Sequence, residues 1–114
     1  MIDTLFTKII NRDIPADIVF ETDDLLAFRD INPQAPVHIL IIPKEPIPTM
    51  NELHRKHEGL MGKLFLAAAH IASQEGIADE GYRVVMNCND AGGQAVYHIH
   101  LHLLGGRQMN WPPG

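Results

Sequence analysis

Apolar and polar residues alternate strictly over positions 98–103, where three histidines are interleaved with three aliphatic side chains. Strict alternation is typical of a strand with one buried face, because side chains at positions i, i+2 and i+4 of a strand point the same way. We therefore expect the aliphatic residues to enter a core and the imidazoles to lie together on the opposite face. The histidines of this run are His98, His100 and His102.

Similar patterns predict the remaining elements. Apolar residues at helical spacing predict a short helix over about 4–11, capped by Asp3, and a long helix over about 54–75, closed by Gly76. Short β-branched or apolar runs between turn residues predict strands. The expected strands are 18–21, 25–29, 37–42, 82–86 and 97–104.

The long helix has one wide apolar stripe, which we expect to face the core. Leu66 lies off this stripe, so a large apolar side chain is left for another surface. The members of the stripe are Leu60, Met61, Leu64, Phe65, Ala68, Ile71 and Ala72.

Five strands and two helices, with hairpin-like order at both ends of the chain, indicate an α+β fold with a mostly antiparallel sheet. A length of 114 residues fits one domain with its own core. We expect residues 1–114 to form that domain, with a C-terminal tail from about 105 to 114.

Composition and charge exclude several classes of protein. The formal net charge is −5 and no segment is rich in Lys or Arg, which argues against a nucleic-acid partner. No apolar stretch reaches the ~18 residues of a membrane span, and no signal-peptide pattern begins the chain. Cys88 is the only cysteine, so we expect no internal disulfide and a reducing, cytoplasmic location.

Three imidazoles on one face suit proton transfer, nucleophilic attack or metal binding. Zinc takes three or four N, S or O ligands, and other histidines and carboxylates could complete such a shell. The neighbouring Gly92 and Gly93 favour phosphate chemistry instead, because backbone N–H groups without a Cβ can approach an oxyanion closely. We therefore expect no metal and no other cofactor. His38 begins the strand over 37–42, where sheet pairing could bring a fourth imidazole beside the three.

Segments along nearly the whole chain resemble the histidine triad (HIT) nucleotide-binding proteins. The histidine run matches the pattern His-φ-His-φ-His-φ-φ, in which φ is apolar. The other matching segments are Asp3-Thr4-Leu5-Phe6, Arg12-Asp13-Ile14-Pro15-Ala16, Ala27-Phe28-Arg29-Asp30-Ile31-Asn32-Pro33-Gln34-Ala35-Pro36, His38, Gly92-Gly93-Gln94 and residues 104–114.

This resemblance implies a HIT-like fold: a five-stranded, mostly antiparallel sheet with two helices per protomer, and sheets joined in a homodimer. It implies a purine nucleoside phosphoramidase, which hydrolyses the P–N bond of AMP joined to an amine or lysine through a covalent nucleotidyl-histidine. His100 is the implied nucleophile. His102 is expected to contact the phosphoryl oxygens and the leaving group, while His98 and His38 orient His100.

The resemblance also implies a set of substrate-binding residues. An apolar cleft suits a purine ring, the Asp30 carboxylate suits a ribose diol, and backbone N–H groups near Gly93 suit a phosphate. Ala95 stands where some relatives carry serine, so a hydroxyl that could assist the leaving group is missing. The implied set is Phe6, Ile9, Ile14, Phe28, Asp30, Ile31, Asn87, Gly93, Gln94, Ala95, Val96 and Trp111, with Trp111 at the edge of the partner protomer's site.

Three alternatives stay open from the sequence. The protein could be a nucleotide-binding or partner-binding module with slow, incidental hydrolysis. It could hydrolyse dinucleoside polyphosphates, as another branch with a similar triad does. Acyl-nucleotides could also be the substrates of the same histidine chemistry.

Overall fold

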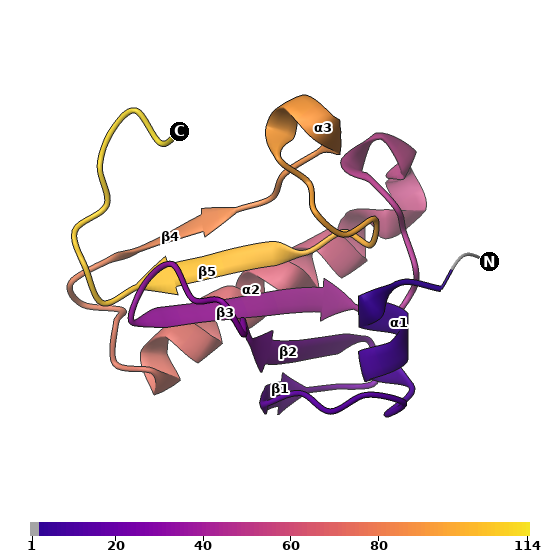
Figure 1. Ribbon diagram of the computed structural model, residues 1–114, viewed down its shortest axis with the longest axis horizontal. Helices are drawn as coiled ribbons and strands as arrows, with labels where there is room; N and C mark the ends of the chain where they lie inside the picture. The colour runs from indigo at the N-terminus through magenta and orange to yellow at the C-terminus, as the bar shows by residue number, and fades with distance from the viewer. Residues whose placement is uncertain (1–2) are drawn as a thin grey trace.

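The computed structural model describes residues 3–114, which form one five-stranded sheet in the order β1-β2-β3-β5-β4 (Figure 1). Every neighbouring pair of strands is antiparallel, so the expected α+β class and sheet are confirmed. The strands are β1 (Ile18–Glu21), β2 (Leu25–Arg29), β3 (Val37–Pro43), β4 (Tyr82–Val85) and β5 (Leu101–Gly105). The helices are α1 (Leu5–Ile10), α2 (Glu58–Gln74) and α3 (Asn89–Gly92), with 3-10 turns η1 (Met50–Glu52) and η2 (Arg55–His57).

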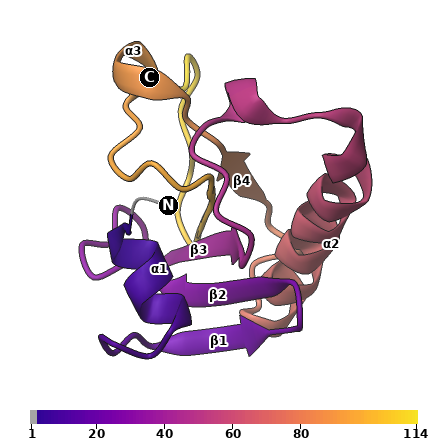
Figure 2. The same ribbon diagram turned by 90° about the vertical axis from the view of Figure 1, so that its right-hand side faces the viewer.

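The two faces of the sheet are covered differently, with α2 on one side and α1 on the other (Figure 2). Alternation within β3 separates the two layers, because neighbouring side chains of a strand point to opposite faces. Ile39 and Ile41 enter the cluster that packs against α2. Leu40 enters a second cluster with Phe6 of α1 and Phe28 of β2, and this second face carries the histidines.

Both predicted helices begin at a different residue, or with a different cap, from the one expected. Thr4, not Asp3, caps α1, because the Thr4 hydroxyl accepts hydrogen bonds from the backbone N–H groups of Phe6 and Thr7. The long helix begins at Glu58 rather than about residue 54. The buried His57 ring accepts a hydrogen bond from the His54 N–H at 2.9 Å, which holds the preceding residues in a tighter 3-10 turn.

The apolar stripe of α2 is narrower than expected. Leu64, Ala68 and Ile71 are buried as predicted. Phe65 was expected in the core, but its side chain is 58 % exposed, and Leu66 beside it is 74 % exposed. The reason is that only the helix face toward the sheet is covered, so the outer face of α2 carries large apolar side chains in this protomer. None of the helices within residues 3–114 is long and apolar enough to cross a membrane.

The strand predicted over 97–104 is observed only from Leu101 to Gly105, so His98 and His100 precede β5. The pairing with β3 stops at Ile41 and Leu101. Pro43 follows shortly on β3 and has no N–H to offer, so the ladder does not continue. The N–H of Ile99 donates to the Ile47 carbonyl instead, at 2.8 Å. The alternation of burial nevertheless holds, since Ile99, Leu101 and Leu103 are all buried.

Candidate active site

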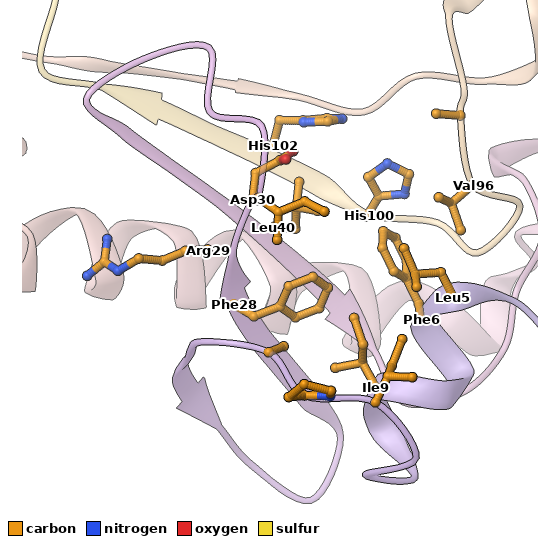
Figure 3. A pocket seen from close by; sticks show the side chains of 15 residues that line it. Leu5, Phe6, Ile9, Phe28, Arg29, Asp30, Leu40, Val96, His100 and His102 are labelled. Atoms are coloured by element: carbon orange, nitrogen blue, oxygen red, sulfur yellow. The ribbon is translucent and has the colours of Figure 1, made fainter.

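Three imidazoles, those of His38, His100 and His102, meet where β3 and β5 lie side by side. His38 comes from β3 and His102 from β5, and the two are 64 residues apart in the chain. Their rings are joined by a hydrogen bond of 2.9 Å between His38 Nε2 and His102 Nδ1. The ring centroid of His100 lies 4.9 Å from that of His102 (Figure 3). The predicted approach of His38 to the triad is therefore confirmed, although its partner is His102 rather than His100.

The ring of His98 is hydrogen-bonded to the end of β3 and not to another imidazole. Its Nε2 donates to the Pro43 carbonyl at 2.7 Å, and its Nδ1 is buried without a hydrogen-bond partner among the described residues. The backbone carbonyl of His98, by contrast, contacts Nδ1 of His100 at 2.8 Å. His98 thus acts on His100 through its main chain, while its side chain ties this segment to the end of β3.

Hydrogen-bond partners decide which ring nitrogen carries the proton in each neutral imidazole. A carbonyl only accepts, so His100 holds its proton on Nδ1 and keeps a lone pair on Nε2. The Gln34 N–H donates to Nδ1 of His38 at 3.0 Å, so the proton of His38 is on Nε2. The Nε2–H of His38 donates to Nδ1 of His102, so the proton of neutral His102 is on its own Nε2.

Burial keeps these imidazoles neutral near pH 7, since a charged ring loses its hydration there. It lowers the pKa values of His98 and His100. Burial, together with repulsion from His100 and His38 when they are protonated, lowers the pKa of His102 to about 4. The pKa of His38 is also lowered by burial, against the opposing effect of the nearby Asp30 carboxylate. A neutral His100 is the form that can act as a nucleophile.

An apolar cavity of about 360 Å³ opens beside His100 and His102, between α1 and the end of β2 (Figure 3). Ten of the sequence-predicted site residues line it: Phe6, Ile9, Ile14, Phe28, Asp30, Ile31, Ala95, Val96, His100 and His102. Leu5, Pro15, Ala16 and Leu40 also line it and were not predicted as site residues. Leu40 could have been found from the sequence, because it lies two positions after His38 and so shares its face of β3.

Asp30 lies at the cavity rim directly after β2. Its Oδ1 accepts a hydrogen bond from the Asn32 N–H at 2.8 Å, and its Oδ2 lies 3.5 Å from Nε2 of His38. The carboxylate therefore has a local role in the turn, as one interpretation of the sequence expects. It also faces the same cavity as the histidines, where it can accept further hydrogen bonds.

Six sequence-predicted residues do not line this cavity: His38 and His98, whose contacts are given above, and Asn87, Gly93, Gln94 and Trp111. Two amides of the expected backbone cradle for phosphate already have partners within the chain, since the N–H groups of Gly93 and Gln94 donate to the Asp90 and Asn89 carbonyls. Gly93, at φ +82°, closes the turn after α3, so these amides satisfy the end of that helix. The Ala95 N–H has no hydrogen bond within residues 3–114.

The side chains of Gln94 and Trp111 also lie outside the cavity. The buried side-chain amide of Gln94 donates to the carbonyls of Pro48 and Val96, and its oxygen accepts from the Asn89 N–H. Trp111 is 82 % exposed, and the Arg83 guanidinium lies 6.0 Å from its ring. Trp111 is thus outside the cavity of its own protomer.

One cluster of side chains in the described part of the chain has the composition of a metal site. Ligand atoms of Asp30, His38 and His102 all lie within 4.8 Å of one another. Two nitrogens and a carboxylate oxygen are suitable for zinc. They fit the ion only if the proton between His38 Nε2 and His102 Nδ1 leaves, because a metal ion needs the lone pairs of both nitrogens.

Comparison with known proteins places these features in a family. The HIT domain profile matches residues 11–109. The chain is 59% identical over 107 residues to the purine nucleoside phosphoramidase of Escherichia coli, covering 94% of this chain and 90% of that protein. It is 53% identical over 114 residues to a 14 kDa zinc-binding protein of Brassica juncea, covering 98% of this chain and 100% of the relative.

A solved structure agrees with this assignment. A HIT family hydrolase from Legionella pneumophila superimposes with a TM-score of 0.96 at 54% sequence identity, over 98% of this chain and 100% of that one. The chain therefore belongs to the HIT domain family.

Proposed function

We propose that this protein is a purine nucleoside phosphoramidase, which hydrolyses the P–N bond between a purine nucleotide and an amine, such as AMP linked to lysine. The observation that carries the proposal is the hydrogen bond from His100 Nδ1 to the His98 carbonyl, which leaves a lone pair on Nε2 of a neutral ring that lines the cavity. The similarity to the Escherichia coli phosphoramidase supports the substrate class.

The nucleotide fits the site in one direction. The purine ring is placed in the apolar part of the cavity against Phe6, Ile9 and Phe28. The ribose diol then lies near Asp30, and the α-phosphorus lies near His100 and His102. The Ala95 N–H is the amide of the predicted cradle that could still donate to a phosphoryl oxygen.

In the first chemical step, Nε2 of His100 forms a bond to the α-phosphorus and the P–N bond breaks. The departing nitrogen keeps the bonding electron pair and takes one proton. That proton comes from solvent, while the Nε2–H of neutral His102 donates to a phosphoryl oxygen and stabilises the charge that develops there. The amine leaves, and a nucleotidyl group remains on His100.

Water completes the cycle. Its oxygen bonds to phosphorus while one of its protons returns to solvent. The bond between phosphorus and His100 Nε2 breaks, and its electron pair returns to the ring as a lone pair. The products are the nucleoside monophosphate and the free amine.

The test is the covalent intermediate. An AMP phosphoramidate with a labelled phosphorus, mixed with the protein and quenched within one turnover, should leave label on His100. His100→Ala should keep the fold and lose turnover by several orders of magnitude, because it removes the covalent step. Activity of this variant within about tenfold of the unmodified protein would contradict the assignment.

The same experiment addresses the other nucleotide interpretations. A binding module with incidental hydrolysis would label His100 far more slowly than a dedicated enzyme releases product. A competition among an AMP phosphoramidate, an acyl-nucleotide and a dinucleoside polyphosphate ranks the three substrate classes by kcat/KM. We expect the phosphoramidate to be preferred.

A second candidate function is zinc binding, which the cluster of Asp30, His38 and His102 favours and which the name of the Brassica juncea relative supports. We expect hydrolysis to be independent of metal, because the proposed steps rely on the hydrogen bond between His38 and His102, which a metal ion at this cluster would break. Protein stripped with a strong chelator should keep its phosphoramidase activity. Activity that is lost on stripping and restored by zinc would instead identify a metallohydrolase.

We further propose that the protein acts as a homodimer in the cytoplasm, with a nucleotide as its only small-molecule partner and with no nucleic-acid or membrane partner. An exposed outer face on α2 and an unpaired edge at β4 support the dimer. In such a dimer the tail around Trp111 would lie near the partner protomer's site, and residues 1–114 would act as one HIT domain with a tail from about 105.

A further inference from the structure

The loop between β2 and β3 supplies the amide that determines the proton position on His38. This is the Gln34 N–H, which donates to His38 Nδ1 at 3.0 Å. The carbonyl of the same residue accepts a hydrogen bond of 3.1 Å from Nε of Arg107. Arg107 lies just beyond β5, so a residue of the C-terminal tail supports a residue that contacts the histidine network.

A second contact joins the tail to this loop. Val37 and Gly105 are paired at the end of the β3–β5 ladder, which brings the next tail residue against Pro36. A Cβ on Gly106 would lie 2.9 Å from Cβ of Pro36, and the φ of Gly106 is +87°. A side chain is therefore disfavoured at Gly106 both by contact and by backbone conformation. The tail approaches the loop closely enough for Arg107 to reach Gln34.

We propose that Arg107 is a positioning residue for the proton arrangement of the active site, an inference that rests on the proposed hydrolysis. Arg107 holds the Gln34 carbonyl, and the Gln34 N–H is thereby aimed at His38 Nδ1. His38 then keeps its proton on Nε2 and donates it to His102 Nδ1. His102 in turn presents an N–H at Nε2, which donates to a phosphoryl oxygen as charge develops there.

The physical reason is that a neutral imidazole has two tautomers of similar energy, and a single hydrogen bond can select one. If the Gln34 N–H turns away, His38 can carry its proton on Nδ1 and accept from His102. The proton of neutral His102 would then sit on Nδ1, and its Nε2 would be a bare lone pair facing the cavity. Molecules in that arrangement lack the N–H donor that stabilises the phosphoryl oxygen.

Arg107→Ala tests the proposal, with Arg107→Lys as the conservative variant. Arg107→Ala removes an exposed hydrogen bond from a charged donor and should lower kcat about fivefold, which corresponds to about 1 kcal/mol. KM should change little, because the apolar cavity and Asp30 are not touched. Arg107→Lys, which keeps a charged donor, should recover part of the loss.

The matched control is Arg83→Ala. Arg83 also reaches the tail, donating to the Asn110 carbonyl at 2.8 Å, but it makes no hydrogen bond to the loop between β2 and β3. The decisive readout is the ¹⁵N NMR signal of the His38 ring, since protonated and bare ring nitrogens differ in shift. Arg107→Ala should move the Nδ1 and Nε2 signals of His38 toward each other, and Arg83→Ala should leave both unchanged.

A double-mutant cycle shows whether Arg107 acts through His38. In a His38→Ala background, Arg107→Ala should cause no further loss of kcat, because the ring that it orients is gone. Additive losses, or an unchanged His38 signal in folded Arg107→Ala, would overturn the proposal. If the unmodified protein does not hydrolyse phosphoramidates, the proposed function fails, while the His38 signals still decide whether Arg107 sets the tautomer.

Discussion

Asp30 combines two tasks at the scale of a single residue. One carboxylate oxygen accepts the Asn32 N–H and so shapes the loop that begins there, while the other faces His38 and the cavity. Because an ionised carboxylate has about four lone-pair sites, it can satisfy the loop and still accept bonds from a ribose diol. A residue that looks like an ordinary turn former can therefore bind a nucleotide.

Asp30→Asn should weaken binding of nucleotides with an intact cis-diol more than binding of their 2′-deoxy analogues. The amide can still accept the Asn32 N–H through its oxygen, but it replaces the second acceptor with a donor. Titration calorimetry with AMP and 2′-deoxy-AMP, on both proteins, measures the difference. Equal losses for the two ligands would show that Asp30 acts only in the turn.

At the scale of an element, α2 shows how a helix can be amphipathic and still carry apolar residues on its outer side. Its inner stripe of Leu64, Ala68 and Ile71 is fully used against the sheet. Phe65 and Leu66 project outward, and neighbouring exposed apolar side chains mark interaction surfaces in small proteins. A second copy of the chain would cover such a face in an isologous dimer.

If the protein forms the proposed dimer through this face, the double variant Phe65→Glu/Leu66→Glu should convert it to monomers at low micromolar concentration, because two charges on each protomer would be buried at the interface. Ser73→Glu is the matched control, since it adds charge to an exposed polar position of the same helix. Sedimentation velocity gives the oligomeric state of each protein. A double variant that sediments like the unmodified protein would place the interface elsewhere.

At the scale of the whole molecule, the buried imidazoles make stability depend on pH. His98, His100 and His102 all have pKa values below 6.5 in the folded protein, while the unfolded chain titrates near 6.5. Below pH 6.5 the unfolded state therefore binds more protons than the folded state. Stability must fall as the pH falls through this range, until the folded pKa of each ring is passed.

The urea midpoint should accordingly be lower at pH 5 than at pH 7.5. His102→Gln should reduce this dependence, because it removes the ring whose pKa is lowered to about 4. Carboxylates with lowered pKa values, such as that of Glu21, contribute mainly below pH 4.5 and so act outside this interval. A midpoint that does not change between pH 7.5 and pH 5 would mean that these rings are already accessible to protons in the folded state.

The sequence by itself determined the elements and their faces, because these depend on local periodicity. Alternation placed Ile99, Leu101 and Leu103 in the core, and the two strands of the first hairpin were predicted to the residue. Local pattern was less reliable at element ends. There, competing hydrogen bonds of Thr4 and His57 shift the boundaries, and neighbours in the fold decide how much of a helix face is covered.

Only the tertiary structure decided what each histidine can do. His38 meets His102 because sheet register joins segments 64 residues apart, and Pro43 stops the ladder so that His98 and His100 leave the strand. The proton on each ring is then set by single partners from elsewhere in the fold, such as the Gln34 N–H and the His98 carbonyl. Periodicity carries no information about such partners, because a hydrogen bond depends on distance and direction between groups that the folded chain brings together.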